Sequence, residues 1–242
     1  IIGWNLFSGS LTDYTTLTKI VYTWILCPFL AAGFGIVIYK LLILYIRKSR
    51  IHMIRIDQFT RIGLILVGAF GSYSLGANNI ANVMGVFVPV SPFKNVEIGG
   101  IIFSSTNILF FFGALAISLG VITYSKKVMT TVGSDIFRLS PLDAFVVVLS
   151  SSLVLFIFAS EGLKALLISV GLPSFPLVPV SSSQAVVGAI LGIALGKGGK
   201  NINFGIMGKI GIGWILTPLV SGIITFILLF FTQNVFMQTV FN

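Results

Sequence analysis

Long apolar stretches alternate with short polar segments along nearly the whole chain. Six of them approach the ~20 residues that a helix needs to cross a bilayer: Ile20–Ile46, Ile62–Val90, Ile98–Thr123, Leu142–Ser160, Val180–Leu195 and Ile210–Phe231. Only 9% of the residues are charged and the mean hydropathy is +1.08, whereas a soluble domain has about 25% charged residues. The pattern predicts an all-α polytopic membrane protein, multi-pass in the cell (plasma) membrane.

The basic residues gather in the segments that join these stretches. If all six cross and the first runs inward, only Lys19, Lys94 and Lys164 lie outside the cell. The other twelve lie at the cytoplasmic face: Lys40, Arg47, Lys48, Arg50, Arg55, Arg61, Lys126, Lys127, Arg138, Lys197, Lys200 and Lys209. The positive-inside rule selects this orientation, and it puts the C-terminus outside. The formal charge of +9 is therefore a topology signal, and we expect no nucleic-acid partner.

Two apolar stretches resemble each other across most of the chain. Thr18–Gly33 and Gly208–Ile223 share a pattern in which Lys19, Trp24 and Pro28 recur as Lys209, Trp214 and Pro218. Four crossings separate the copies, so they point in opposite directions, which is typical of inverted-repeat transporters with broken or re-entrant helices. We expect residues 1–50 to hold the last helix of a first inverted repeat and residues 51–242 to form the second. The chain would then be one transmembrane domain of a longer protein whose N-terminal repeat is missing here.

The segment GANNIANVMG, Gly76–Gly85, interrupts an apolar stretch with three amides. Asn78, Asn79 and Asn82 share a helix face at spacings of three and four residues, and each amide offers both donors and an acceptor. A helix can break inside a membrane only where its freed backbone groups meet protein or a water-filled cavity. We interpret the segment as a break that builds a binding site; amide contacts that only hold helices together are the alternative.

A second polar insertion, Gly171–Gly192, starts with three prolines and continues into SSSQAVVGAILG. The prolines stop regular helix, and Ser181-x-x-Gln184 fits a capping box at a new helix start. The free N–H groups there, with the hydroxyls of Ser182 and Ser183, favour an anion. Gly188, Gly192 and Gly196 would let this helix pack closely on a neighbour. An ordinary helix start at the membrane surface is the alternative.

Together the two insertions suggest one site for an oxyanion and a metal cation. An oxyanion needs N–H and O–H donors, while sodium needs amide, hydroxyl or carbonyl oxygens, and both sets are present. We predict that Gly76–Asn82 and Pro179–Gln184 are both non-helical and lie close together.

At these residues the sequence resembles the inorganic phosphate transporter (PiT) family. Each half of that family carries a G-A-N-D-x-A-N-A-like segment, a P-V-S-T-T-H-like turn with a Gly-rich helix, and a K-x-x-x-x-W-x-x-x-P helix. Their counterparts here, in the same order, are GANNIAN (Gly76–Asn82), PVSSSQAVVGA (Pro179–Ala189) and KIGIGWILTP (Lys209–Pro218). The resemblance implies a cation-coupled importer of inorganic phosphate that works by alternating access, as a homodimer in the lipid bilayer.

Three departures from the family pattern bear on the coupling ion. Asn79 replaces the usual Asp, Ser182-Ser183-Gln184 replaces Thr-Thr-His, and Val148 stands where many members carry Glu. None of these side chains titrates, so we expect Na⁺ as the transported coupling ion and no cofactor. The expected phosphate ligands are Ser181, Ser182, Ser183, Gln184 and Asn79; the expected Na⁺ ligands are Asn78, Asn79, Asn82 and Ser182. An H⁺-coupled phosphate permease or a sulfate permease of the same fold remains the alternative.

Other classes of function fit less well. The acidic residues Asp13, Asp57, Glu97, Asp135, Asp143 and Glu161 lie in loops or at the ends of stretches and form no catalytic set, so we do not expect an enzyme. The single cysteine, Cys27, permits no internal disulfide, and no Cys/His spacing indicates a bound metal. A passive anion channel would differ from a transporter by lacking saturable uptake driven by an ion gradient.

Overall fold

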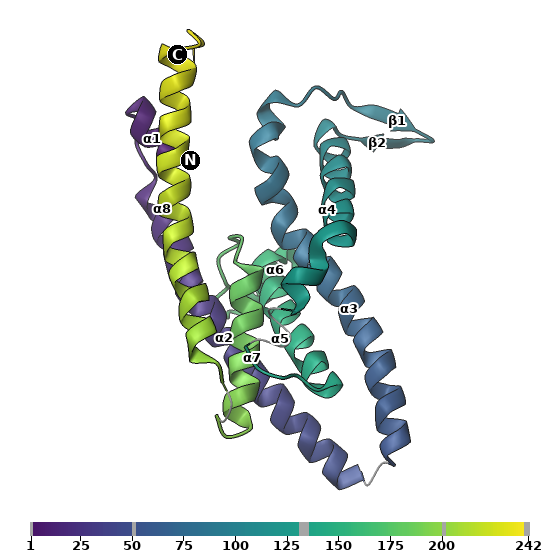
Figure 1. Ribbon diagram of the computed structural model, residues 1–242. Helices are drawn as coiled ribbons and strands as arrows, with labels where there is room; N and C mark the ends of the chain where they lie inside the picture. The colour runs from purple at the N-terminus through teal and green to yellow at the C-terminus, as the bar shows by residue number, and fades with distance from the viewer. Residues whose placement is uncertain (1, 50–51, 131–135, 200–201, 240–242) are drawn as a thin grey trace. The chain divides into compact units, whose positions relative to one another are not determined.

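The computed structural model describes residues 2–49, 52–130, 136–199 and 202–239, and this part of the chain is mostly helical (Figure 1). The helices are α1 (Ile2–Ser8), α2 (Tyr14–Ser49), α3 (Met53–Met84), α4 (Ser105–Thr130), α5 (Pro141–Ala159), α6 (Glu161–Ser169), α7 (Ser182–Gly196) and α8 (Phe204–Asn234). A 3₁₀ turn, η1 (Gly85–Val90), extends α3, and two strands, β1 (Val96–Ile98) and β2 (Ile101–Phe103), follow it.

Five of these helices are long and apolar enough to cross a membrane. They are α2, α3 continued by η1, α4, α5 and α8. The sixth predicted crossing, Val180–Leu195, is corrected: α7 has 15 residues, about 22 Å at 1.5 Å per residue, short of the ~30 Å hydrocarbon core. The helix is short because the three prolines delay its start until Ser182 and Gly198 and Gly199, both at positive φ, end it.

The predicted break at Gly76–Asn82 is wrong, because α3 continues through it to Met84. Asparagine in a helix interior costs well under ~1 kcal/mol relative to alanine, and the amide of Asn78 finds partners without any unwinding. The regular helix ends at Gly85, shortly before Pro89, which supplies no N–H and disfavours helix at the residue before it. The second predicted break, Pro179–Gln184, is confirmed only for Pro179–Ser181, which continue a non-helical segment that starts at Leu172. Ser182, Ser183 and Gln184 already form the first turn of α7, because the Ser181 cap starts the helix there.

A β-hairpin replaces the expected start of the third apolar stretch. Strands β1 and β2 pair antiparallel, with Ile98 opposite Ile101. Gly99 and Gly100, at φ +59° and +82°, form the two-residue turn, whose positive φ values glycine accepts without strain. The membrane helix α4 therefore begins at Ser105, later than the predicted Ile98.

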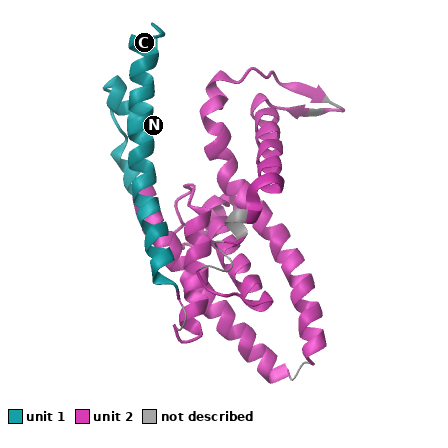
Figure 2. Ribbon diagram, in the orientation of Figure 1, with its two compact units in different colours: residues 1–19, 203–242 teal, residues 20–202 magenta. Residues whose placement is uncertain are grey.

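The chain divides into two compact units (Figure 2). One unit comprises residues 1–19 and 203–242, and in it α1 packs along α8. The rings of Phe7 and Phe226 meet edge to face at 5.4 Å between centroids. Gly3 faces the backbone of Gly222 and has no room for a Cβ. The assignment of residues 1–50 and 51–242 to two inverted repeats stays a prediction.

The other unit, residues 20–202, is built around α5. Helix α5 packs against α3 on one side and α7 on another, and α4 lies along α3. The buried apolar side chains of this unit come chiefly from α5 and α7 and include Val146, Val154, Phe158, Ala185, Ile190 and Ile193. Both predicted polar motifs belong to this unit, so their relation can be described directly.

Candidate functional site

The start of α7 carries the serine and glutamine side chains predicted to bind an anion. Ser181 is the N-cap: its Oγ accepts from the backbone N–H of Gln184 at 3.4 Å and lies 3.0 Å from the Ser183 Oγ. Gln184 is 6% exposed and its Oε1 has no hydrogen-bond partner among the described residues. The predicted capping box is therefore only half formed, which leaves the glutamine amide free to meet a ligand.

Asn78 holds this helix start against α3 through two hydrogen bonds to one residue. Its Oδ1 accepts from the Val180 N–H at 3.1 Å, and its Nδ2 donates to the Val180 carbonyl at 2.8 Å. The same Nδ2 donates to Asn79 Oδ1 at 3.2 Å. Asn78 is 3% exposed, so these bonds satisfy polar groups that water does not reach. The prediction that the two motifs lie close together is confirmed.

The predicted site residues differ in how far the structure gathers them. Asn79 is half-buried and is linked through Asn78 to the residue that precedes Ser181. Ser181 and Ser182 are half-buried, and Ser183 is exposed. Asn82 is also exposed and makes no side-chain hydrogen bond to a described residue. The predicted phosphate ligands therefore lie near one another. Asn82, a predicted Na⁺ ligand, lies one helical turn beyond Asn78 and takes no part in these hydrogen bonds.

Two further residues at the site were not singled out from the sequence. Cys27, fully buried on α2, donates through Sγ to the Ser181 carbonyl at 3.7 Å. Ser74 is fully buried one helical turn before Asn78, and its Oγ has no partner among the described residues. The spacing of four residues between Ser74 and Asn78 places both on one helix face and could have identified the serine. Nothing in the local sequence indicates the contact of Cys27.

Close backbone contact fixes the position of α7 on α2. Gly188 faces the backbone of Pro28 and Gly192 that of Ala32, and neither glycine has room for a Cβ. Gly35 of α2 faces the Ala189 carbonyl in the same way. The predicted glycine ridge is confirmed at these two positions of α7, since small residues allow helix backbones to approach closely.

An ion pair between a partly exposed lysine and a buried carboxylate joins the end of α7 to the start of α5. Lys197, the C-cap of α7, lies with its Nζ 2.6 Å from Asp143 Oδ2. The same carboxylate oxygen accepts from the N–H and the hydroxyl of Ser140. Each charge complements the dipole of its helix end. The pair shows that α5 and α7 run antiparallel, with the start of α5 beside the end of α7.

The chemistry available at the α7 start is that of neutral donors and neutral oxygens. Serine hydroxyls and first-turn N–H groups can donate to an oxyanion, and amide oxygens can ligate a hard cation. No group of three or more His, Cys, Asp or Glu side chains that could hold a metal occurs within the described ranges. The arrangement suits binding of an anion and a cation rather than proton transfer or bond cleavage.

Comparison with known proteins assigns nearly the whole chain to one protein family. A family model described as "Phosphate transporter family" matches residues 1–165 and 165–241. A protein of Methanocaldococcus jannaschii named "Putative phosphate permease" is 29% identical over 228 residues, which are 94% of this chain and 64% of that protein. A protein of the same name from Haemophilus influenzae is 30% identical over 190 residues, or 77% of this chain and 40% of its own length.

A solved structure has the same fold. "The sodium-dependent phosphate transporter" aligns with a TM-score of 0.62 and 22% identity, over 88% of this chain and 66% of its own. This chain spans 64% of the length of the M. jannaschii relative. These findings support a polytopic, mostly helical membrane protein of a transporter family.

Proposed function

Because the chain belongs to the phosphate transporter family, we propose that its protein imports inorganic phosphate together with Na⁺ by alternating access. The start of α7 carries the proposal. It combines the free N–H groups of a helix N-terminus with three serine hydroxyls and the side-chain N–H₂ of the buried Gln184. Helix N-termini attract anions through their partial positive charge and aimed donors.

Phosphate would bind against Ser181, Ser182, Ser183 and Gln184. The hydroxyls and the first-turn N–H groups donate to its oxygens, as does the side-chain N–H₂ of Gln184. Asn79 would contact the anion from α3, because Asn78 holds α3 against the residue just before Ser181. The site needs no arginine, since the helix dipole and a nearby cation offset the charge of the anion.

Sodium would be that cation. Asn78, Asn79, Asn82 and Ser182 offer amide and hydroxyl oxygens, and none of them binds or releases protons near neutral pH. The sodium dependence stated in the name of the structural relative agrees with this choice. Proton-coupled phosphate uptake and sulfate uptake on the same fold are the competing functions, and a homodimer remains an expectation.

Uptake into proteoliposomes tests the proposal. Labelled phosphate should accumulate only under an inward Na⁺ gradient, and sulfate should not compete. Asn79→Ala and Ser183→Ala should each lower uptake at least ~10-fold, or about 1.4 kcal/mol, because each removes a proposed ligand. Asn107→Ala and Ser118→Ala are matched controls: both residues are exposed on α4, and uptake should stay at the parent level. Uptake that follows a pH gradient without Na⁺, or that survives both site substitutions, would contradict the proposal.

A further inference from the structure

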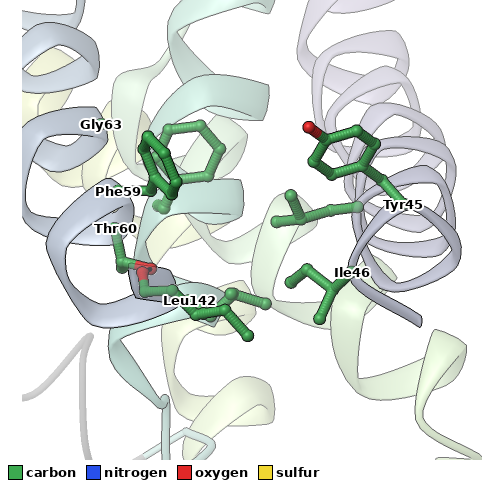
Figure 3. Close-up of a pocket in the computed structure, with 9 residues that line it drawn as sticks. Tyr45, Ile46, Phe59, Thr60, Gly63 and Leu142 are labelled. Atoms are coloured by element: carbon green, nitrogen blue, oxygen red, sulfur yellow. Dashed lines mark hydrogen bonds between the residues drawn. The ribbon is translucent and has the colours of Figure 1, made fainter. Parts of the chain in front are cut away.

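A separate cavity lies near the loop that joins α2 and α3. It has a volume of about 240 Å³ and is lined by the last turns of α2, the first turns of α3 and the start of α5. Figure 3 shows Tyr45 and Ile46 of α2 facing Phe59, Thr60 and Gly63 of α3 across the space, with Leu142 of α5 closing it below. All of these residues belong to the unit of residues 20–202.

The lining of this pocket suits a hydrocarbon chain. No lining residue is charged, and the Thr60 hydroxyl already donates to the Ile56 carbonyl at 2.8 Å. The Tyr45 hydroxyl is the polar group that remains, and it projects into the space between the helices (Figure 3). A tyrosine of this kind can contact the ester region of a lipid while its ring stays among apolar groups.

Basic side chains flank the pocket on the loop side. Lys48 follows Tyr45 by three residues and Arg55 precedes Phe59 by four, so each shares a helix face with a lining residue. Both are exposed, and neither forms an ion pair within the described ranges. The nearby Arg61, by contrast, already pairs with Asp57 at 2.9 Å. Two positive charges without an ion-pair partner among the described residues therefore lie within about one helical turn of the pocket lining.

The pocket begins at the border between headgroups and acyl chains and extends inward from there. Tyr45 lies four residues before the end of α2 and Gly63 ten residues after the start of α3. At 1.5 Å per residue these positions are about 6 and 15 Å from the helix ends. Charged ends of membrane helices lie at the headgroup level, so the lining begins just beneath it.

We propose that this pocket binds one anionic phospholipid, with an acyl chain between α2, α3 and α5 and the headgroup phosphate on Lys48 and Arg55. The acyl chain contributes little to the preference for the pocket over the bilayer, because the surrounding bilayer is as apolar as the pocket. The charges select the lipid, since basic pockets between membrane helices bind anionic headgroups. The site is distinct from the start of α7 and does not depend on the proposed transport function.

Native mass spectrometry of the intact purified protein tests the site. Phosphatidylglycerol and phosphatidylcholine with identical chains serve as probes, and one phosphatidylglycerol should be retained in preference. Lys48→Gln together with Arg55→Gln should weaken its retention about 25-fold, or fivefold for each charge, equivalent to ~1 kcal/mol. Leu42→Trp, which fills the cavity, should abolish retention of both lipids at this site.

Matched variants control for the two changes. Leu44→Trp places the same ring two residues away on an exposed part of α2, and Lys126→Gln with Lys209→Gln removes two exposed charges elsewhere; retention should be unchanged in both. Inorganic phosphate in the buffer should not displace the lipid. Equal retention of the two lipids, full retention by the Lys48/Arg55 variant, or displacement by inorganic phosphate would overturn the proposal. Retention of no lipid would also overturn it.

Discussion

Asn78 shows how one side chain can connect two motifs that are 102 residues apart in the sequence. Its amide pairs with both backbone groups of Val180, as a neighbouring strand would. The extended segment before α7 has no strand partner among the described residues, so this amide satisfies backbone groups that would otherwise be buried and unpaired. Asn78 therefore acts as a structural clamp in addition to its proposed role as a Na⁺ ligand.

Asn78→Ala should destabilise the protein by about 2 kcal/mol, because a buried donor or acceptor left unpaired costs ~1–3 kcal/mol. Thermal unfolding in detergent would measure the change. Asn107→Ala, at an exposed position on α4, is the matched control and should unfold at the parent temperature. An unchanged unfolding temperature for Asn78→Ala would show that Val180 does not rely on this amide.

From the Asp143–Lys197 ion pair we predict that replacing the lysine alone lowers the stability of the protein. Asp143 is 1% exposed and Lys197 31% exposed at the side chain, so Lys197→Met leaves a buried carboxylate without its cation. Breaking a fully buried pair costs 3–5 kcal/mol; partial exposure of the lysine reduces this to about 2 kcal/mol. Adding Asp143→Asn to Lys197→Met should restore more than half of the lost stability in the same unfolding assay. A double variant as unstable as Lys197→Met would rule out charge as the cause.

At the scale of elements, α7 is a short helix held from several sides. The residue before its N-cap, Val180, is bonded to α3, its glycine face packs on α2, and its C-cap, Lys197, forms an ion pair with α5. A helix of this length cannot cross the bilayer unaided, so these contacts rather than the lipid fix where its N-terminus lies. That arrangement keeps the free N–H groups of the first turn at one defined place.

Gly188→Ala should destabilise the protein by about 1–3 kcal/mol, the usual cost of overpacking, because a Cβ there meets the Pro28 backbone. Gly196→Ala is the matched control on the same helix: its Cβ would lie an ordinary 3.5 Å from Tyr39. Since alanine is the better helix former by ~1 kcal/mol, this control should match or exceed the parent in thermal unfolding. Equal stability of the two variants would mean that α7 does not press against α2.

At the scale of the whole molecule, the antiparallel pairing of α5 and α7 bears on topology. The start of α5 and the end of α7 lie together at the Asp143–Lys197 pair. The segments before α5 and after α7 therefore emerge on the same side, whether the two helices cross fully or turn back inside the bilayer. The shortness of α7 thus leaves the predicted orientation of the chain unaltered.

We therefore still expect the C-terminus outside the cell. A tag after Asn242 should react with a membrane-impermeant label added to whole cells, because the basic segments favour the cytoplasmic side. A tag inserted in the loop after Ser49 is the control and should react only after the cells are opened. The opposite pattern of labelling would reverse the topology.

Membrane class, the helix start at Ser182 and the family could all be read from the sequence, because each depends on local signals: apolar length, prolines before a serine cap, and short motifs in order. The continuity of α3 could not be read from the sequence. Three amides and a glycine predict a break unless a distant backbone segment supplies hydrogen-bond partners for the amides. Val180 supplies that partner for Asn78. The contact of Cys27 with the Ser181 carbonyl and the apolar pocket between α2, α3 and α5 likewise arise from neighbours far along the chain. Long-range packing of this kind leaves no periodic or compositional trace in the sequence.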